Sequence, residues 1–317
     1  MSKMNNNGSS YWQNRAKAEQ AYQQEQLKDV NAFNKQIASM YNAAMIDIEK
    51  DITYDLAQIS KSGGLAERKA LLHKLNSINA QASEWQKLIN LPKKNFNEEM
   101  QKRVNLLKFS MELSRNEFLK ADVGARLTQL GLDHQKALTN KLLSDYDKET
   151  RRQMGILSGT AKEDLFRKAD TLKTLYIQIG GADFSDRIWA NVDRLKAGLD
   201  GVIASELISG KNPRDIAEKL NLYVKNDFQN ADYASERIAR TETARIQYVA
   251  AVNALKGYGY SYARWYAEPV ACKICAGIAD YDDGVGRGIY PLKDLPEVPE
   301  HPNCRCSVGA YWVDKSK

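Results

Sequence analysis

The sequence contains Cys272-Lys273-Ile274-Cys275 and, after a segment with several glycines and prolines, His301-Pro302-Asn303-Cys304-Arg305-Cys306. These two stretches hold all four cysteines of the 317-residue chain and one of its three histidines. A C-x-x-C pair directs two thiolates at one ion, and zinc takes four thiolate or imidazole ligands in tetrahedral geometry. The spacing therefore predicts a structural zinc site with more candidate ligands than positions. The candidates are Cys272, Cys275, His301, Cys304 and Cys306.

Two other uses of the cysteines fit the sequence less well. A pair of disulfides would suit a secreted domain, but the chain begins with the polar run Met1-Ser2-Lys3-Met4-Asn5, which does not resemble a signal peptide. No further cysteine is present to build a disulfide scaffold. A redox-active C-x-x-C motif would need a βαβ context, and the surrounding sequence predicts short strands and turns.

A catalytic zinc ion would need an open coordination position and a nearby general base. Glu268 and Glu300 are the only evident acids beside the candidate ligands, and His73 and His134 lie far away in predicted helices. A single histidine on a helix is usually a surface or core residue. We therefore expect a protein that is not an enzyme and has no small-molecule substrate, with a metal-dependent hydrolase or nuclease as an alternative.

The composition favours long, exposed helices over a compact globule. Hydrophobic residues make up 43% of the chain and charged residues 27%, and the mean hydropathy is −0.56. No run of eighteen apolar residues occurs, so we expect no membrane span. The formal net charge of +6 permits weak attraction to nucleic acid without requiring it.

Apolar residues recur at steps of three and four along most of the chain, which predicts amphipathic helices. Glycine pairs at 63–64 and 180–181 and the proline at 92 mark boundaries between them. The predicted helices cover residues 11–60, 65–89, 96–121, 123–157, a segment that starts at 184, a short segment from 213 to about 223, and 233–256.

After Gly259 the period of the pattern changes to two, with tyrosines at alternate positions, which predicts a strand over 260–267. A second strand is predicted over 307–313, and an irregular loop over 276–299. The sequence thus predicts a mainly α protein, with an elongated helical N-terminal part and a small α+β, zinc-stapled C-terminal module. We expect a disordered tip (1–10), a helical N-terminal region (11–180), a helical core (181–259) and the small zinc-binding module (260–317).

A group of charged residues lies on the predicted helix over 233–256. Glu242 precedes Arg245 by three residues and Glu236 precedes Arg240 by four, so both pairs can bridge on the helix surface. Spacing alone favours a solvated charged face. Contact with a partner or with phosphate is the alternative, through Arg237, Arg240, Glu242 and Arg245.

The order of these motifs resembles that of a known family. The motifs are Phe184-Ser185-Asp186-Arg187-Ile188-Trp189, Ser209-Gly210-Lys211-Asn212-Pro213, Ala239-Arg240-Thr241-Glu242-Thr243-Ala244-Arg245, Arg264-Trp265 and the two cysteine stretches. Together they are similar to the phage head-morphogenesis family, the minor head proteins similar to protein F of phage Mu. The resemblance covers about residues 181–313, and its specificity comes from the combination.

The resemblance implies a low-copy structural protein of a tailed-phage head. Family members associate with the portal protein or the capsid interior during assembly, and some are implicated in DNA packaging or ejection or bind DNA. The expected partners are therefore the portal protein, the major capsid protein or double-stranded DNA. The expected location is the virion, with the host cytoplasm during assembly. Some members carry an enzyme domain after the cysteine motif; here 307–317 follow it, so we expect none. A zinc-scaffolded DNA-binding protein is the alternative function.

Overall fold

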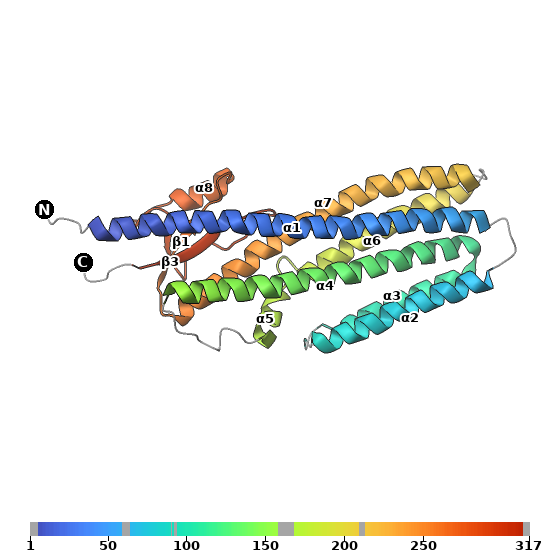
Figure 1. Cartoon of the computed structure of the whole chain (residues 1–317), viewed down its shortest axis with the longest axis horizontal. Helices are drawn as coiled ribbons and strands as arrows, with labels where there is room; N and C mark the ends of the chain where they lie inside the picture. The colour runs from blue at the N-terminus through green and yellow to red at the C-terminus, as the bar shows by residue number, and fades with distance from the viewer. Residues whose placement is uncertain are drawn as a thin grey trace. The chain divides into compact units, whose positions relative to one another are not determined.

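The computed structural model describes residues 6–58, 64–89, 91, 94–157, 168–208 and 213–312. These residues form eight helices and a small antiparallel sheet of three strands (Figure 1). The predicted mainly α fold, with a small α+β part near the C-terminus, is confirmed. In the described ranges, every helix lacks the combination of length and apolar character that crossing a membrane needs.

The helices are α1 (Asn6–Gln58), α2 (Leu65–Leu88), α3 (Phe96–Leu113), α4 (Arg115–Leu157), α5 (Lys168–Leu175), α6 (Phe184–Ile208), α7 (Pro213–Gly257) and α8 (Lys273–Asp280). The strands are β1 (Tyr262–Tyr266), β2 (Ile289–Pro291) and β3 (Ser307–Tyr311). Helix α1 begins inside the predicted disordered tip. Residues 1–5, the predicted helix end at 60 and the predicted turn at 209–212 lie outside the described residues.

Three predicted boundaries are wrong, each for a local reason. The break between α3 and α4 falls at Ser114, not near 122, because the Ser114 hydroxyl accepts a hydrogen bond from the Glu117 N–H (3.2 Å) and caps α4. Helix α7 is one helix where two were predicted, since 214–256 contain neither glycine nor proline. The predicted loop over 276–299 contains most of α8 and all of β2.

The described chain forms two compact units, each built from segments that are distant in the sequence. Unit 1 comprises Met1–Asn34, Asn140–Leu175 and Arg237–Lys317, and unit 2 comprises Lys35–Thr139 and Tyr176–Glu236. The division between the units falls within α1, α4 and α7. The sequence predicted three consecutive regions (11–180, 181–259 and 260–317). That division describes the order of elements along the chain, and it stays a prediction.

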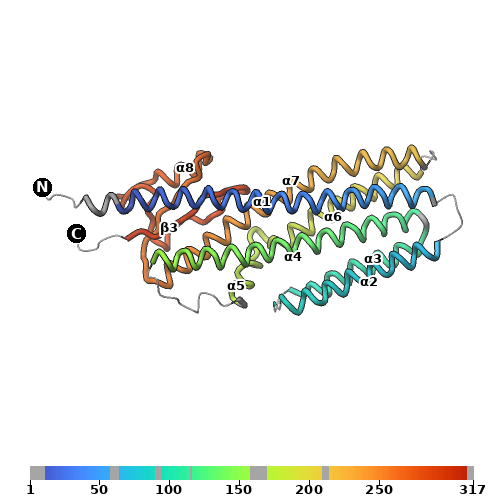
Figure 2. The backbone as a smooth tube through the Cα atoms, viewed as in Figure 1, coloured from blue at the N-terminus to red at the C-terminus, as the bar shows by residue number. Residues whose placement is uncertain are grey.

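Unit 2 is mainly helical, with two isolated β-bridges in its connections, and includes the antiparallel pair α2 and α3 (Figure 2). Its core contains a polar contact between the Tyr41 hydroxyl and His134 Nδ1, 3.3 Å apart. Burial lowers the pKa of His134 to about 3, so its imidazole is neutral at physiological pH. His134 is therefore a core residue, as expected for a lone helical histidine, whereas His73 is exposed.

In unit 1 the sheet has the strand order β2-β1-β3, and α7 packs on one of its faces. Trp265 and Val308 are cross-strand partners on that face and share a buried apolar cluster with Leu255 of α7. The N-terminal part of α1 approaches the sheet along β3. There the Gln23 side-chain amide donates to the Tyr266 carbonyl (3.0 Å) and to the Ser307 hydroxyl (2.8 Å).

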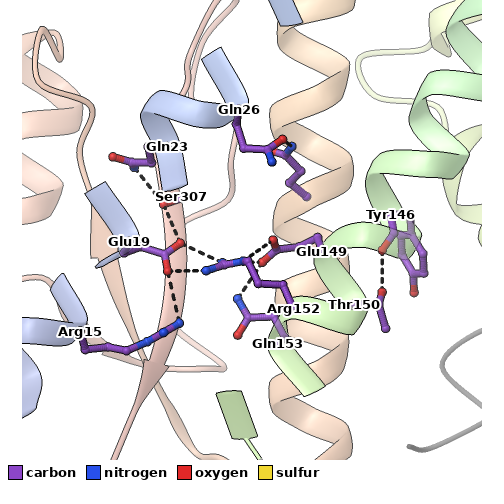
Figure 3. Close-up of polar contacts among 11 residues, drawn as sticks. Arg15, Glu19, Gln23, Gln26, Tyr146, Glu149, Thr150, Arg152, Gln153 and Ser307 are labelled. Carbon is purple, nitrogen blue, oxygen red and sulfur yellow. Dashed lines mark hydrogen bonds and ion pairs between the residues drawn. The ribbon is translucent and has the colours of Figure 1, made fainter. Parts of the chain in front are cut away.

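A buried ion-pair network joins α1 to α4 within unit 1 (Figure 3). The Arg152 guanidinium donates to both carboxylate oxygens of Glu19, at 2.9 Å each, and to both of Glu149, at 2.8 Å each. Both carboxylates are buried, and burial alone would lower the pKa of Arg152; pairing with Glu149 and Glu19 raises it instead. Arg15 donates to Glu19 as well, at 3.4 Å, which completes the charge balance.

We predict that Arg152→Met lowers the free energy of unfolding by about 3–5 kcal/mol, because it leaves the buried Glu149 carboxylate without this cation and Glu19 with only the longer contact to Arg15. Urea unfolding followed by tryptophan fluorescence measures the change. The matched control is Arg151→Met, one residue earlier, where the side chain is 67% exposed and pairs with Asp147 on the helix surface. That change should alter stability by less than about 0.5 kcal/mol; equal losses in the two variants would contradict a structural role for the network.

Candidate metal centre

The two cysteine stretches meet at the start of α8. Cys272 is the N-cap residue of α8, and its sulfur accepts a hydrogen bond from the Cys275 N–H at 3.5 Å. Cys304 and Cys306 come from the segment that leads into β3, and both are buried. All five predicted ligands fall into two overlapping groups that share Cys275, each with ligand atoms within 4.8 Å of one another. The cluster can bind a metal ion.

Three of the distances within the cluster match those of a tetrahedral site. His301 Nε2 lies 3.3 Å from Cys272 Sγ and 3.4 Å from Cys275 Sγ. Cys275 Sγ lies 3.8 Å from Cys304 Sγ. Zinc–sulfur bonds of about 2.3 Å and zinc–nitrogen bonds of about 2.0–2.1 Å place tetrahedral ligand atoms about 3.5–3.8 Å apart. These distances suit a zinc-sized ion between Cys272, Cys275 and His301, whereas Cys304 is grouped with Cys275 and Cys306.

The orientation of His301 also suits metal binding. Its Nδ1 atom lies 2.9 Å from the Pro302 carbonyl oxygen and donates to it in the tautomer that we assign. That tautomer leaves the lone pair of Nε2 directed at the sulfurs of Cys272 and Cys275. A backbone carbonyl that fixes the second ring nitrogen is a common way of orienting a metal-binding histidine.

Cys306 lies close to two of the other cysteines, because the sulfurs of Cys275, Cys304 and Cys306 are all within 4.8 Å of one another. The interaction of its thiol with Cys304 raises the pKa of Cys306, and burial raises it further. The same interaction lowers the pKa of Cys304 to about 5. Burial raises the pKa of Cys275 to about 12, whereas the Cys275 backbone N–H lowers the pKa of Cys272.

The ligand loop is anchored on α7 by Thr241. The Thr241 hydroxyl accepts a hydrogen bond from the Asn303 N–H (3.0 Å) and donates to the Arg237 carbonyl (2.7 Å). Asn303 has a left-handed backbone, with φ of 67°, which asparagine tolerates better than most residues. Neither residue was predicted to anchor the loop. The one feature of the sequence that could have indicated it is an asparagine between two candidate ligand positions.

Glu242 and Arg245 are buried, at 2% and 4% exposure, so the solvated charged face predicted from spacing is wrong for them. Their predicted ion pair is confirmed at 2.6 Å. Arg245 also donates to the carbonyls of Thr174 (3.1 Å) and Leu175 (2.8 Å), and so caps the last turn of α5. Another helix end covers this part of α7, and neither side chain is available to an external partner.

Arg237 is exposed, and Arg240 is half-buried in the lining of a small cavity next to Cys306. The cavity has a volume of about 40 Å³, enough for a few water molecules. Of the four charged residues proposed for partner contact, only Arg237 and Arg240 therefore keep exposed surface. The Glu236–Arg240 pair stays a prediction.

The two acids near the ligands have different surroundings. Glu268 is buried and its Oε2 lies 2.8 Å from Arg305 Nη2, so this carboxylate is held by a cation. Glu300 is exposed to solvent. Glu268 thus forms an ion pair beside the cluster. Its partner Arg305 lies between Cys304 and Cys306 in the sequence, so the pair fixes the position of the loop.

Comparisons of the chain with protein-family models, with curated proteins and with solved structures found no significant match. A function for the chain has to be argued from its own residues and geometry.

We predict that Thr241→Val lowers the free energy of unfolding by about 1–2 kcal/mol, because the Asn303 N–H loses its acceptor. The ligand loop should then also lose bound metal faster to a chelator, measured with a coloured metal indicator. Thr241→Ser keeps the hydroxyl and should behave like the parent chain. Equal effects of valine and serine would show that the hydroxyl is not what holds the loop.

Proposed function

We propose that the cluster is a structural zinc site with Cys272, Cys275, His301 and Cys304 as its ligands. Three thiolates and one imidazole form a closed tetrahedral set that leaves no position for a substrate. Three distances support the assignment: those from His301 Nε2 to the sulfurs of Cys272 and Cys275, and that from Cys275 Sγ to Cys304 Sγ. Cys306 is then a buried thiol that donates a hydrogen bond to the Cys304 ligand.

The surroundings of the cluster explain what a bound metal would contribute. Three short strands bury little apolar surface, and the segment between β2 and β3 has almost no regular structure. Binding of zinc to preorganised thiolates supplies folding free energy in such modules. The metal would join the start of α8 to the ligand loop and so fix the entry into β3.

We predict that the purified chain contains about one zinc ion per molecule. Cys304→Ser should lose most of this metal, whereas Cys306→Ser should retain it, because only Cys304 is a ligand in the proposed set. Elemental analysis after extensive dialysis measures both. Removal of zinc by a chelator should change the near-UV signal of the sheet and leave most of the far-UV helical signal.

Retention of zinc by Cys304→Ser together with its loss from Cys306→Ser would reverse the ligand assignment. Absence of any divalent metal from the parent chain, when it is purified without chelator under reducing conditions, would refute the zinc site itself.

We further propose that the protein is a minor structural component of a tailed-phage head that acts in assembly at the portal or the inner shell. One observation supports this proposal: three of the motifs that carry the family resemblance contact one another within unit 1. Thr241 of the Arg-Thr-Glu-Thr helix binds the backbone of the cysteine loop, and Trp265 of β1 shares a core with the thiols. These three motifs therefore belong to one physically connected structure.

The test of this proposal is incorporation into heads. Co-expression with the portal and major capsid proteins of the same genome should yield particles that contain the chain at low copy number, detected by quantitative mass spectrometry. Omitting the portal protein shows which partner recruits it. Heads that assemble fully and contain none of the chain, although it is soluble in the same cells, would contradict the proposal.

Double-stranded DNA is a second candidate partner, favoured by the exposed Arg237 on α7 and the net charge of +6. No observation on the described residues favours the hydrolase alternative, because Glu268 is held by Arg305 and the four donor atoms close the coordination sphere.

A further inference from the structure

A row of aromatic rings crosses the end of the sheet in unit 1 and continues onto α1. Tyr262 of β1 lies directly opposite Tyr311 of β3, so their side chains share one face of the sheet. The Trp12 ring stacks on Tyr311 with centroids 4.3 Å apart and planes at 30°. Tyr11 meets Trp12 edge-on, at 4.9 Å and 77°. Three elements thus contribute to one continuous aromatic surface.

Much of this surface faces solvent. Tyr11 is 55% exposed, and Trp12, Tyr262 and Tyr311 are half-buried. Trp312, the residue after β3, is 61% exposed and meets the Tyr260 ring edge-on at 5.9 Å, but strand alternation places it on the side of Val308 and Ala310, outside the row. Exposed aromatic rings that gather at one place mark an interaction site more often than an isolated exposed ring does.

Folding accounts for only part of this arrangement. The opposite face of the sheet supplies the core, through Trp265 and Val308. Helix α1 contacts β3 through a polar interaction, the hydrogen bond from Gln23 to Ser307. The Trp12–Tyr311 stack adds to this contact, but the outward surface of Tyr11 stabilises nothing in the described chain.

The charge beside the rings is positive. Arg264 lies on the same face as Tyr262, two residues further along β1, and its guanidinium is 5.6 Å from the Tyr266 ring. Within the described residues it forms no ion pair with a carboxylate. Among the residues that the structure describes, Glu19 approaches this face near Gly309, and its charge is balanced by Arg152 and Arg15.

We propose that the aromatic row binds single-stranded nucleic acid. Unpaired bases would stack on the exposed rings, and Arg264 would contact a backbone phosphate. A duplex would not suit the surface, because its bases are already stacked on one another and present only their edges. A neutral glycan would use the rings but not the unpaired cation. The proposal does not depend on the zinc assignment or on a role in phage heads.

The test uses the full chain and a fluorescently labelled oligothymidine of about 15 nucleotides at about 50 mM salt, where phosphate contacts are strong. Fluorescence anisotropy should show saturable binding that is at least about tenfold tighter than binding of a duplex of equal length. Quenching of tryptophan emission should follow the same curve. Tyr11→Ala and Trp12→Ala should each weaken binding by about tenfold.

Arg264→Ala should weaken binding and reduce the slope of log affinity against log salt by about 0.7, the value for one phosphate contact to a single strand. The matched control is Tyr54→Ala in unit 2, where a tyrosine of equal exposure (54%) lies outside the row; it should leave binding unchanged. Tyr11→Phe keeps a ring and should retain affinity, which separates stacking from a loss of folding.

Three results would overturn the proposal. They are equal affinity for duplex and single strand, unchanged binding in both Tyr11→Ala and Trp12→Ala, or saturable binding of a neutral chitin oligosaccharide or a proline-rich peptide at this surface without oligothymidine binding. Circular dichroism of each variant confirms that the fold is intact. Detection of the chain in heads has no bearing on this measurement, so failure of one proposal does not affect the other.

Discussion

Unit 1 depends on a buried ion-pair network in which the Arg152 guanidinium lies between two buried carboxylates. Arg152 comes from α4, Glu19 from α1, and both lie where Gln23 reaches β3. A buried charge without a partner is strongly unfavourable, so the removal of one member destabilises the others. The network therefore favours the packing of α1 against α4 in which each carboxylate meets an arginine.

The small sheet follows from that constraint. Strands of three to five residues form no independent domain, but here α7 covers the apolar face, and α1 is held along β3. The thiol cluster adds a third restraint where the loop before β3 has no regular structure. The charged motif on α7 belongs to the same framework, since Thr241 holds the loop and Arg245 holds the end of α5.

The long helices were predictable because apolar periodicity is a local property of the sequence. The errors occurred where a single contact decides the outcome. Ser114 ends one helix and caps the next, a signal as short as Ser114-x-x-Glu117. Helix α8 escaped prediction because eight residues are too few to show a period, and its N-cap is a cysteine that was interpreted only as a ligand.

The five ligand residues were predictable from spacing alone, because thiols and a histidine at such intervals have few other uses. The sequence could not predict which of the five is not a ligand, because that choice depends on differences of a few tenths of an ångström between interatomic distances. The burial of Glu242 and Arg245 could not be predicted from the sequence either. Their spacing is equally compatible with a solvated face, and only the position of the Thr174 and Leu175 carbonyls decides between the two.

The composition of unit 1 from distant segments has a consequence for synthesis on the ribosome. Gln23 emerges long before its hydrogen-bond partner Ser307, which is separated from it by 284 positions. At about 5–20 residues per second, the N-terminal part of α1 waits tens of seconds for the strand that it will contact. During that interval, the face of α1 that is buried in the folded protein, including Glu19, is exposed to solvent. All residues of unit 2 have been synthesised once Glu236 has emerged. Unit 2 can therefore fold before the last segment of unit 1 has been made.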